Sequence, residues 1–140
     1  MADLTDTIKA KTDQLNADDF KIFPAHALLG QIKRVVKTGG DQPVSVWLSS
    51  WDQPWKPCKT MRRVMFELWG KESDDYIGRS VRLTRDPEVG FGTQLRIGGV
   101  RISHLSDVPK ETGNIVIVKT SKGQTRPYRV DAVTSEMFKA

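Results

Sequence analysis

The sequence predicts a mainly β domain with one helix between its strands. Apolar and polar residues alternate over several short segments, which is the period of half-buried strands. Glycine and proline cluster between those segments, as they do at turns. From Thr60 to Gly70 the apolar residues instead follow helical spacing. The chain has 140 residues, which is the length of a single domain, and it can bury roughly two thirds of its unfolded surface.

The N-terminal segment differs from the rest of the chain. Leu4, Ile8 and Leu15 stand among polar residues and make only a thin apolar stripe. This pattern predicts an arm over residues 1–20 that is either helical or frayed. The folded domain is expected to span residues 21–140.

Two long strands are expected next. Residues 26–37 have a spacing that also fits a helix, but Gly30 and the run TGGDQP that follows favour a strand with a bulge and then a turn. Residues 44–51 alternate strictly, which predicts a second strand. Trp47 and Trp51 are expected on the face of this strand opposite its valines.

The helix and the C-terminal strands complete the order. Thr60 is expected to cap the helix and Gly70 to end it. The segments RSVRLTRD and TQLRIGGVRI then resume the alternation, and the pair Gly98 and Gly99 predicts a bulge or a bend. The segments NIVIVKT and RPYRVDAV, joined by SKGQ, predict a closing hairpin.

Strands before and after a single helix are the order of the OB-fold, a five-stranded and partly open barrel that mostly binds oligonucleotides. A small α+β sheet would give nearly the same order of elements, so the order alone leaves both architectures open. An OB-fold-like β-barrel is the fold that we expect.

The charge of the chain is unevenly distributed. The net charge is +5, and residues 1–23 hold three lysines and five aspartates, so the remaining residues carry +7. A basic body attracts a polyanionic partner, and nucleic acid is the commonest one.

Arginines concentrate on the strands predicted after the helix. Alternate residues of a strand share a face, so Arg82 and Thr84, and likewise Arg101 and Ser103, are expected to point away from the core. Guanidinium groups grip phosphates and stack on bases, which suits a groove that follows a single strand. Any one arginine could equally keep the sheet surface soluble. The whole set favours nucleic acid, because residues 56–101 hold ten basic and six acidic side chains.

The tryptophans are the second signal. Trp47 and Trp51 could stack against unpaired bases, each stack contributing roughly 1 to 3 kcal/mol. Core packing is an equal alternative for these two residues and is the expected role of Trp69, since tryptophan is mostly buried. Trp55, which stands between two prolines and beside Lys56, is predicted to be partly exposed.

These two signals define a predicted binding surface. The predicted nucleic-acid-binding residues are Lys33, Arg34, Trp47, Trp51, Trp55, Lys56, Lys59, Arg62, Arg79, Arg82, Arg85, Phe91, Arg96 and Arg101. No catalytic residue, cofactor or metal site is expected, because the two histidines lie far apart in sequence and no carboxylate pattern recurs. Cys58, the one cysteine, is expected to be a small packing residue.

The composition also indicates a compartment. A single cysteine cannot form an internal disulfide, so a reducing environment fits. No run approaches the roughly 18 apolar residues that span a bilayer, and the N-terminus has no apolar segment of the kind that secretory signals carry. The expected location is therefore the cytoplasm, without a membrane partner.

The middle of the chain resembles a family of small proteins from tailed bacteriophages and prophages. The family pattern is an aromatic or aliphatic pair, a Gly-Lys/Arg step, a V-x-L strand, a proline, F-G and a closing G-[VI]-R-[IV]. The matching positions are Tyr76, Ile77, Gly78, Arg79, Val81, Leu83, Pro87, Phe91, Gly92, Gly99, Val100, Arg101 and Ile102. The upstream segment WKPCKTMRRVMFELWG is similar to that family's K-P-x-x-x-K/T helix. The resemblance covers about the middle half of the chain.

The resemblance implies an OB-like fold and a role in phage DNA metabolism, such as replication or recombination, in the cytoplasm of a bacterial host. The expected ligand is single-stranded DNA in preference to RNA, bound without enzymatic activity. The alternative is a phage interaction module that inhibits or redirects a host or anti-phage machine, and a homodimer remains open. The chain ends TSEMFKA, without the acidic tail by which many single-strand-binding proteins recruit partners.

Overall fold

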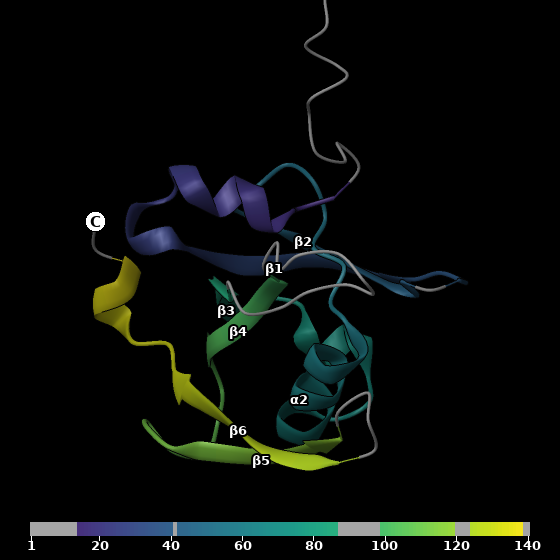
Figure 1. Cartoon of the computed structure of the whole chain (residues 1–140), viewed down its shortest axis with the longest axis vertical. Coiled ribbons are helices and arrows are strands. Elements are labelled where there is room, and N and C mark those ends of the chain that lie inside the picture. Colours follow the sequence, from purple (N-terminus) through teal and green to yellow (C-terminus); the bar gives the residue numbers. More distant parts are fainter. Residues whose placement is uncertain (1–13, 41, 87–98, 120–123, 139–140) are drawn as a thin grey trace, which may run out of the picture.

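The computed structural model describes residues 14–40, 42–86, 99–119 and 124–138 (Figure 1). Six strands form one mixed sheet in the order β2-β1-β3-β4-β6-β5. The strands are β1 (Ala27–Lys37), β2 (Val44–Leu48), β3 (Ser80–Asp86), β4 (Gly99–Leu105), β5 (Asn114–Lys119) and β6 (Thr125–Ala132). The helices are α2 (Lys59–Trp69) and the short 3-10 turns η1 (Ala17–Ile22), η2 (Pro24–His26), η3 (Ser73–Tyr76) and η4 (Ser135–Phe138). The predicted mainly β class, with a helix between strands, is confirmed.

The sheet is mixed and does not close into a barrel within the described residues. Strands β1, β3 and β4 are antiparallel neighbours, whereas β4 and β6 run parallel. The strands β5 and β6 form the predicted C-terminal hairpin. Helix α2 lies between this hairpin and the strands β3 and β4 (Figure 1). The arrangement is therefore a curved open sheet wrapped around one helix.

Strand β1 connects the two ends of this arrangement. Its first half pairs with β3 and its second half with β2, and the pairing register shifts between Ile32 and Arg34, where a bulge was predicted nearby. Gly30 lets the chain after β2 cross close to the strand. A Cβ atom at Gly30 would lie 2.6 Å from Ser50 Oγ and 3.0 Å from Leu48 Cβ. The absence of a side chain there is a packing requirement.

Helix α2 turns an apolar stripe toward the sheet. Met61, Val64, Met65 and Trp69 are buried at helical spacing. The predicted cap at Thr60 is wrong: the helix begins one residue earlier at Lys59, and Cys58 occupies the cap position without a side-chain hydrogen bond. The predicted end of the helix at Gly70 is confirmed, and its φ of 94° is a conformation that glycine adopts at low cost.

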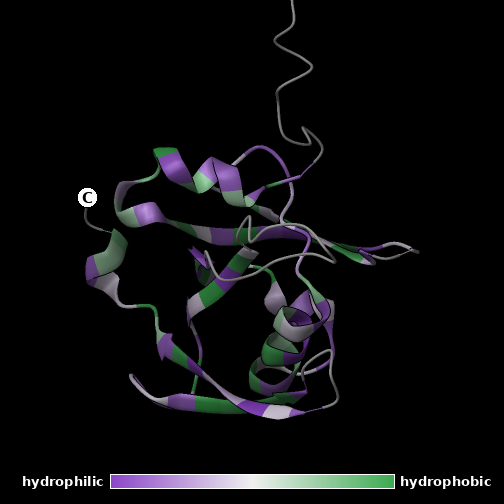
Figure 2. Ribbon diagram, viewed as in Figure 1, coloured by the Kyte–Doolittle hydropathy of each residue, from purple (hydrophilic) through white to green (hydrophobic). Residues whose placement is uncertain are grey.

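The core draws on every strand and on the N-terminal segment. Apolar and hydrophilic residues are interspersed along β4 (Figure 2), whereas β5 alternates buried and exposed positions along an apolar run from Ile115 to Val118. Leu15 and Phe20 are both buried in this core, and the Leu15 amide donates to the Pro54 carbonyl over 2.8 Å. The described end of the predicted arm, residues 14–20, thus packs on the domain. No helix of the described ranges combines the length and the apolar character needed to cross a bilayer.

Candidate nucleic-acid interface

The pairing of β3 with β4 places a group of polar side chains on one face. In the register, Arg82 is opposite His104 and Thr84 is opposite Arg101. Cross-strand partners share a face of the sheet. The other face is apolar, because Val81, Leu83, Ile102 and Leu105 are buried. We refer to the outward surface formed by Arg82, Thr84, Arg101, Ser103 and His104 as the β3–β4 face.

The guanidinium of Arg82 is held by a hydroxyl group. Arg82 Nη1 donates to Ser103 Oγ over 2.9 Å, and Ser103 Oγ lies 3.2 Å from the Arg82 carbonyl, to which it donates. Ser103 also contacts His104 Nδ1 at 2.8 Å. The register shift beside Arg82 brings Ser103 and His104 opposite this one arginine. The cation is therefore held by a neutral hydroxyl group, and no described carboxylate forms an ion pair with it.

His104 contributes to this face as a neutral ring near pH 7. Burial and the neighbouring charge of Arg82 lower its pKa below the usual value, and Asp131 partly opposes that shift. Asp131 is the register partner of His104 on β6. It accepts hydrogen bonds from the Gly113 amide at 2.9 Å and from Arg129 Nε at 3.0 Å, which lower the pKa of its carboxyl group.

Arg101 continues the face toward the start of helix α2. Its Nη1 donates to Cys58 Sγ over 2.8 Å. Behind it, the Tyr128 hydroxyl donates to the Ile102 carbonyl, and burial raises the pKa of Tyr128 to about 12. Arg101 therefore lies beside a thiol and near a neutral phenol. Among the described residues, no carboxylate comes within ion-pair distance of Arg82 or Arg101.

A second cation lies next to an accessible indole on β1 and β2. Arg34 and Trp47 are cross-strand partners, and the Arg34 guanidinium lies 4.9 Å from the centre of the Trp47 ring. Trp47 is half-buried. Lys33, which precedes Arg34 in the chain, is exposed, and its Nζ donates to Gln31 Oε1 at 3.0 Å. This pair offers an aromatic surface and positive charge together, as a base-stacking platform requires.

The other two tryptophans of the predicted surface are packing residues. Trp55 is only 2% exposed, so the prediction that it is partly exposed is wrong. Both of its backbone groups bond to Val46, at 2.7 and 2.8 Å, which draws the segment onto β2. Strand β2 ends at Leu48, so Trp51 does not share a strand face with Trp47. Trp51 instead packs edge-to-face on Phe23 at 5.0 Å.

The arginines do not form a single ladder. Arg85 is the register partner of Val100, so strand alternation places it on the face opposite Arg82. Arg79 precedes β3 and lies 5.3 Å from the centre of the Trp69 ring and 3.9 Å from Asp107. The expectation that these cations converge is thus met by Arg82 and Arg101 and not by Arg79 or Arg85.

The remaining predicted residues lie elsewhere or are not described. Lys56 is half-buried just before α2, Lys59 is exposed at its first turn, and Arg62 lies on the helix. Phe91 and Arg96 lie outside the described residues. The sequence prediction did not include His104, because its place on this face depends on the register shift between β3 and β4, which leaves no local signal.

Comparisons of the chain with protein-family models, with curated proteins and with solved structures give no match. Within the described ranges, no three histidine, cysteine, aspartate or glutamate side chains are grouped so as to hold a metal ion.

Proposed function

We propose that the protein binds single-stranded DNA in phage DNA metabolism, without catalysing a reaction. The observation that carries this proposal is the position of Arg82 and Arg101 on one face of two neighbouring strands, with no described carboxylate paired to either. The phage setting is inferred from the resemblance of residues 76–102 to tailed-phage proteins.

Phosphate contacts would supply most of the affinity. A guanidinium group binds a phosphate through two parallel hydrogen bonds, and replacing Ser103 Oγ by a phosphate oxygen would require Arg82 to give up one hydrogen bond. Thr84 adds a hydroxyl group that can donate to a phosphate oxygen beside the guanidinium groups. His104 is neutral near pH 7 and offers a ring for stacking or a hydrogen bond.

Trp47 would supply the contact with an unpaired base. Its indole is half-buried and carries Arg34 at 4.9 Å, so a base could replace or extend that stack. In the sheet, β1 lies between β2 and β3 and is hydrogen-bonded to both. A single strand crossing from β4 toward β2 would thus meet Arg101, Arg82 and then Trp47.

The strand connections support an OB-like fold as part of the proposal. Without β2, the strand order is β1-β3-β4-β6-β5. Strands β1, β3 and β4 are antiparallel neighbours, and β6, the second strand of the C-terminal hairpin, pairs with β4 in parallel. This is the strand order of the five-stranded OB barrel, in which the second and third strands form the oligonucleotide-binding face. Those strands correspond to β3 and β4. The helix departs from the pattern, because α2 precedes β3 rather than following β4.

Binding is tested by fluorescence anisotropy of a labelled oligo-dT at two salt concentrations. We expect binding that weakens steeply with salt, because counterions are released when phosphates are neutralised. The double variant Arg82→Ala/Arg101→Ala should lose most of the affinity. Arg126→Ala is the matched control, since Arg126 is an exposed arginine of the hairpin. Salt-independent binding, or equal affinities of the two variants, would refute the assignment.

The exposed face of β5 supports a second candidate, the phage interaction module. Ile115 and Ile117 are 55% and 63% exposed on this strand. Apolar side chains at alternate positions of an outer strand suit contact with another protein. Ile117→Lys separates the two functions: an interaction module should lose a partner captured from host lysate, whereas oligo-dT binding through β3 and β4 should be unchanged.

A further inference from the structure

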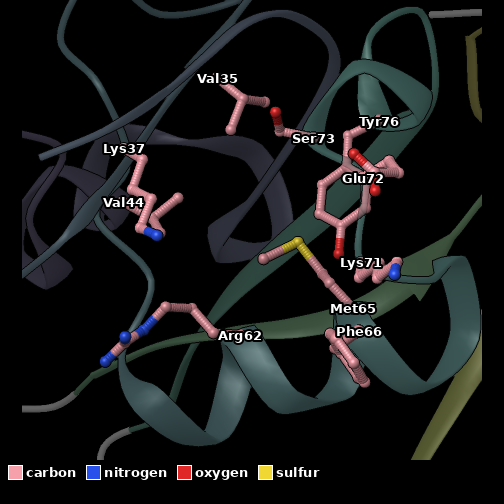
Figure 3. Close-up of a pocket in the computed structure, with 10 residues that line it drawn as sticks. All are labelled: Val35, Lys37, Val44, Arg62, Met65, Phe66, Lys71, Glu72, Ser73 and Tyr76. Carbon is pink, nitrogen blue, oxygen red and sulfur yellow. The ribbon is translucent and has the colours of Figure 1, made fainter.

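A groove of about 280 Å³ lies between the β1–β2 hairpin and helix α2 (Figure 3). Val35 and Val44 line it from the hairpin, and Met65 and Phe66 line it from the helix. Tyr76 of η3 closes one end. Met65 is buried, whereas Phe66 is 54% exposed and forms an open wall. None of the lining residues belongs to β3 or β4, so the groove is separate from the β3–β4 face.

Positive charge surrounds the apolar middle of this groove. Lys37 and Arg62 lie at one end, and Lys71 lies at the other end beside Tyr76 (Figure 3). Among the described residues that line the groove, Glu72 is the one acidic residue, which leaves these residues with a net charge of +2. The Nε atom of Arg62 is buried and has no hydrogen-bond acceptor among the described residues.

We propose that the groove binds an acidic peptide segment of a partner protein through one bulky apolar side chain. The anchor would lie between Val35, Val44 and Met65, and carboxylates on either side of it would meet Lys37 and Lys71. The volume suits one large side chain rather than a whole folded element. Carboxylates paired with lysines on both sides of the anchor would strengthen peptide binding and make it depend on salt.

The chemistry of the groove favours this occupant over a nucleobase. A base has polar atoms around its edge, and those atoms would lose water against Val35, Val44 and Met65 without gaining partners. The hydroxyl hydrogen of Tyr76 is already donated to the Gly70 carbonyl at 2.7 Å, so it is not available to a ligand. A leucine or phenylalanine side chain loses no hydrogen bond on entering the same space.

The first test is direct binding of a defined probe. A fluorescein-labelled hexapeptide Asp-Glu-Asp-Phe-Asp-Glu is titrated with the whole protein and followed by anisotropy. Replacing its phenylalanine by alanine, or its acidic residues by lysine, should weaken binding by about tenfold or more, because anchor and charge are both required. No binding of the probe, or equal binding of the alanine peptide, would overturn the proposal.

Variants then locate the peptide. Lys37→Ala/Lys71→Ala and Phe66→Ala alter exposed side chains of the groove and should weaken the probe while leaving oligo-dT binding unchanged. Lys110→Ala is the matched control, because Lys110 is an exposed lysine outside the groove. Arg82→Ala/Arg101→Ala should retain the peptide even if nucleic-acid binding is lost. The proposal would be overturned if the groove variants bound the peptide with unchanged affinity. It would also be overturned if oligo-dT displaced the probe and the groove variants lost oligo-dT binding.

Discussion

Arg101 Nη1 lies 2.8 Å from the thiol of Cys58, which stands immediately before helix α2. The two residues are far apart in the sequence and meet because the start of α2 packs beside β4. Cys58 is exposed, so the prediction that it is a small packing residue is wrong, and it is the only cysteine of the chain. A label on this thiol would therefore report on, and interfere with, one edge of the β3–β4 face.

Modification of Cys58 should reduce nucleic-acid affinity. A bulky anionic maleimide would place negative charge next to Arg101, whereas the small neutral adduct from methyl methanethiosulfonate should have less effect. Bound oligo-dT should in turn slow the reaction of Cys58, which is measured by mass spectrometry over time. Equal reaction rates with and without oligo-dT would separate this thiol from the binding surface.

Trp47 should account for most of the fluorescence change on binding oligo-dT. Trp55 and Trp69 are buried, and Trp51 packs on Phe23, so stacking by a base should quench Trp47 above all. Trp47→Ala should weaken binding between about 5-fold and about 150-fold, the range that corresponds to one base stack. Trp51→Phe is the comparison variant. If Trp51→Phe abolishes the quenching and Trp47→Phe retains it, the stacking site is elsewhere.

The stability of the protein should fall as the pH drops below about 6.5, the pKa of an unfolded histidine. Burial and Arg82 lower the pKa of His104 in the folded state, so the unfolded chain binds a proton more readily. Stability therefore rises with pH across the window from the lowered pKa up to the usual value. His104→Gln should flatten this part of the dependence, as measured by urea unfolding at several pH values. An unchanged slope in the variant would show that another group is responsible.

Local patterns were enough to predict most of the elements. Strands β2 and β3 follow the alternation of apolar and polar residues, and α2 follows helical spacing up to Gly70. Strand β1 was predicted instead from Gly30 and the turn residues after it, and the C-terminal hairpin from two short segments joined by SKGQ. The neighbours of each strand were harder to predict, because pairing is decided by packing between distant segments. One pairing that local patterns do not predict is the parallel contact of β4 with β6, which brings His104 opposite Asp131.

The residues of the candidate site were only partly predicted, because their grouping also depends on packing between distant segments. Alternation correctly separates Arg82 from its buried neighbours, but it also places Arg85 on the other face, which a count of basic residues ignores. Trp55 lies between two prolines, which favoured exposure, yet its own amide and carbonyl groups pair with Val46 and carry the ring into the core. The backbone hydrogen bonds of a short bridge thus outweighed the local composition.

Replacing Gly30 by alanine should destabilise the fold at the crossing of β1 and the chain after β2. The new methyl group would lie 2.6 Å from Ser50 Oγ and 3.0 Å from Leu48 Cβ, both shorter than a normal contact. The expected loss in the free energy of unfolding is about 1 to 3 kcal/mol, the usual cost of overpacking. Urea denaturation measures this loss.

Adding Ser50→Ala to the variant should recover part of the loss, because it removes the nearer atom while Leu48 still limits the space. Gly39→Ala is the control, since no atom lies within 4 Å of the position its Cβ would take, and it should change stability by less than about 0.5 kcal/mol. Equal stabilities of Gly30→Ala and Gly39→Ala would show that the chain does not cross β1 this closely in solution.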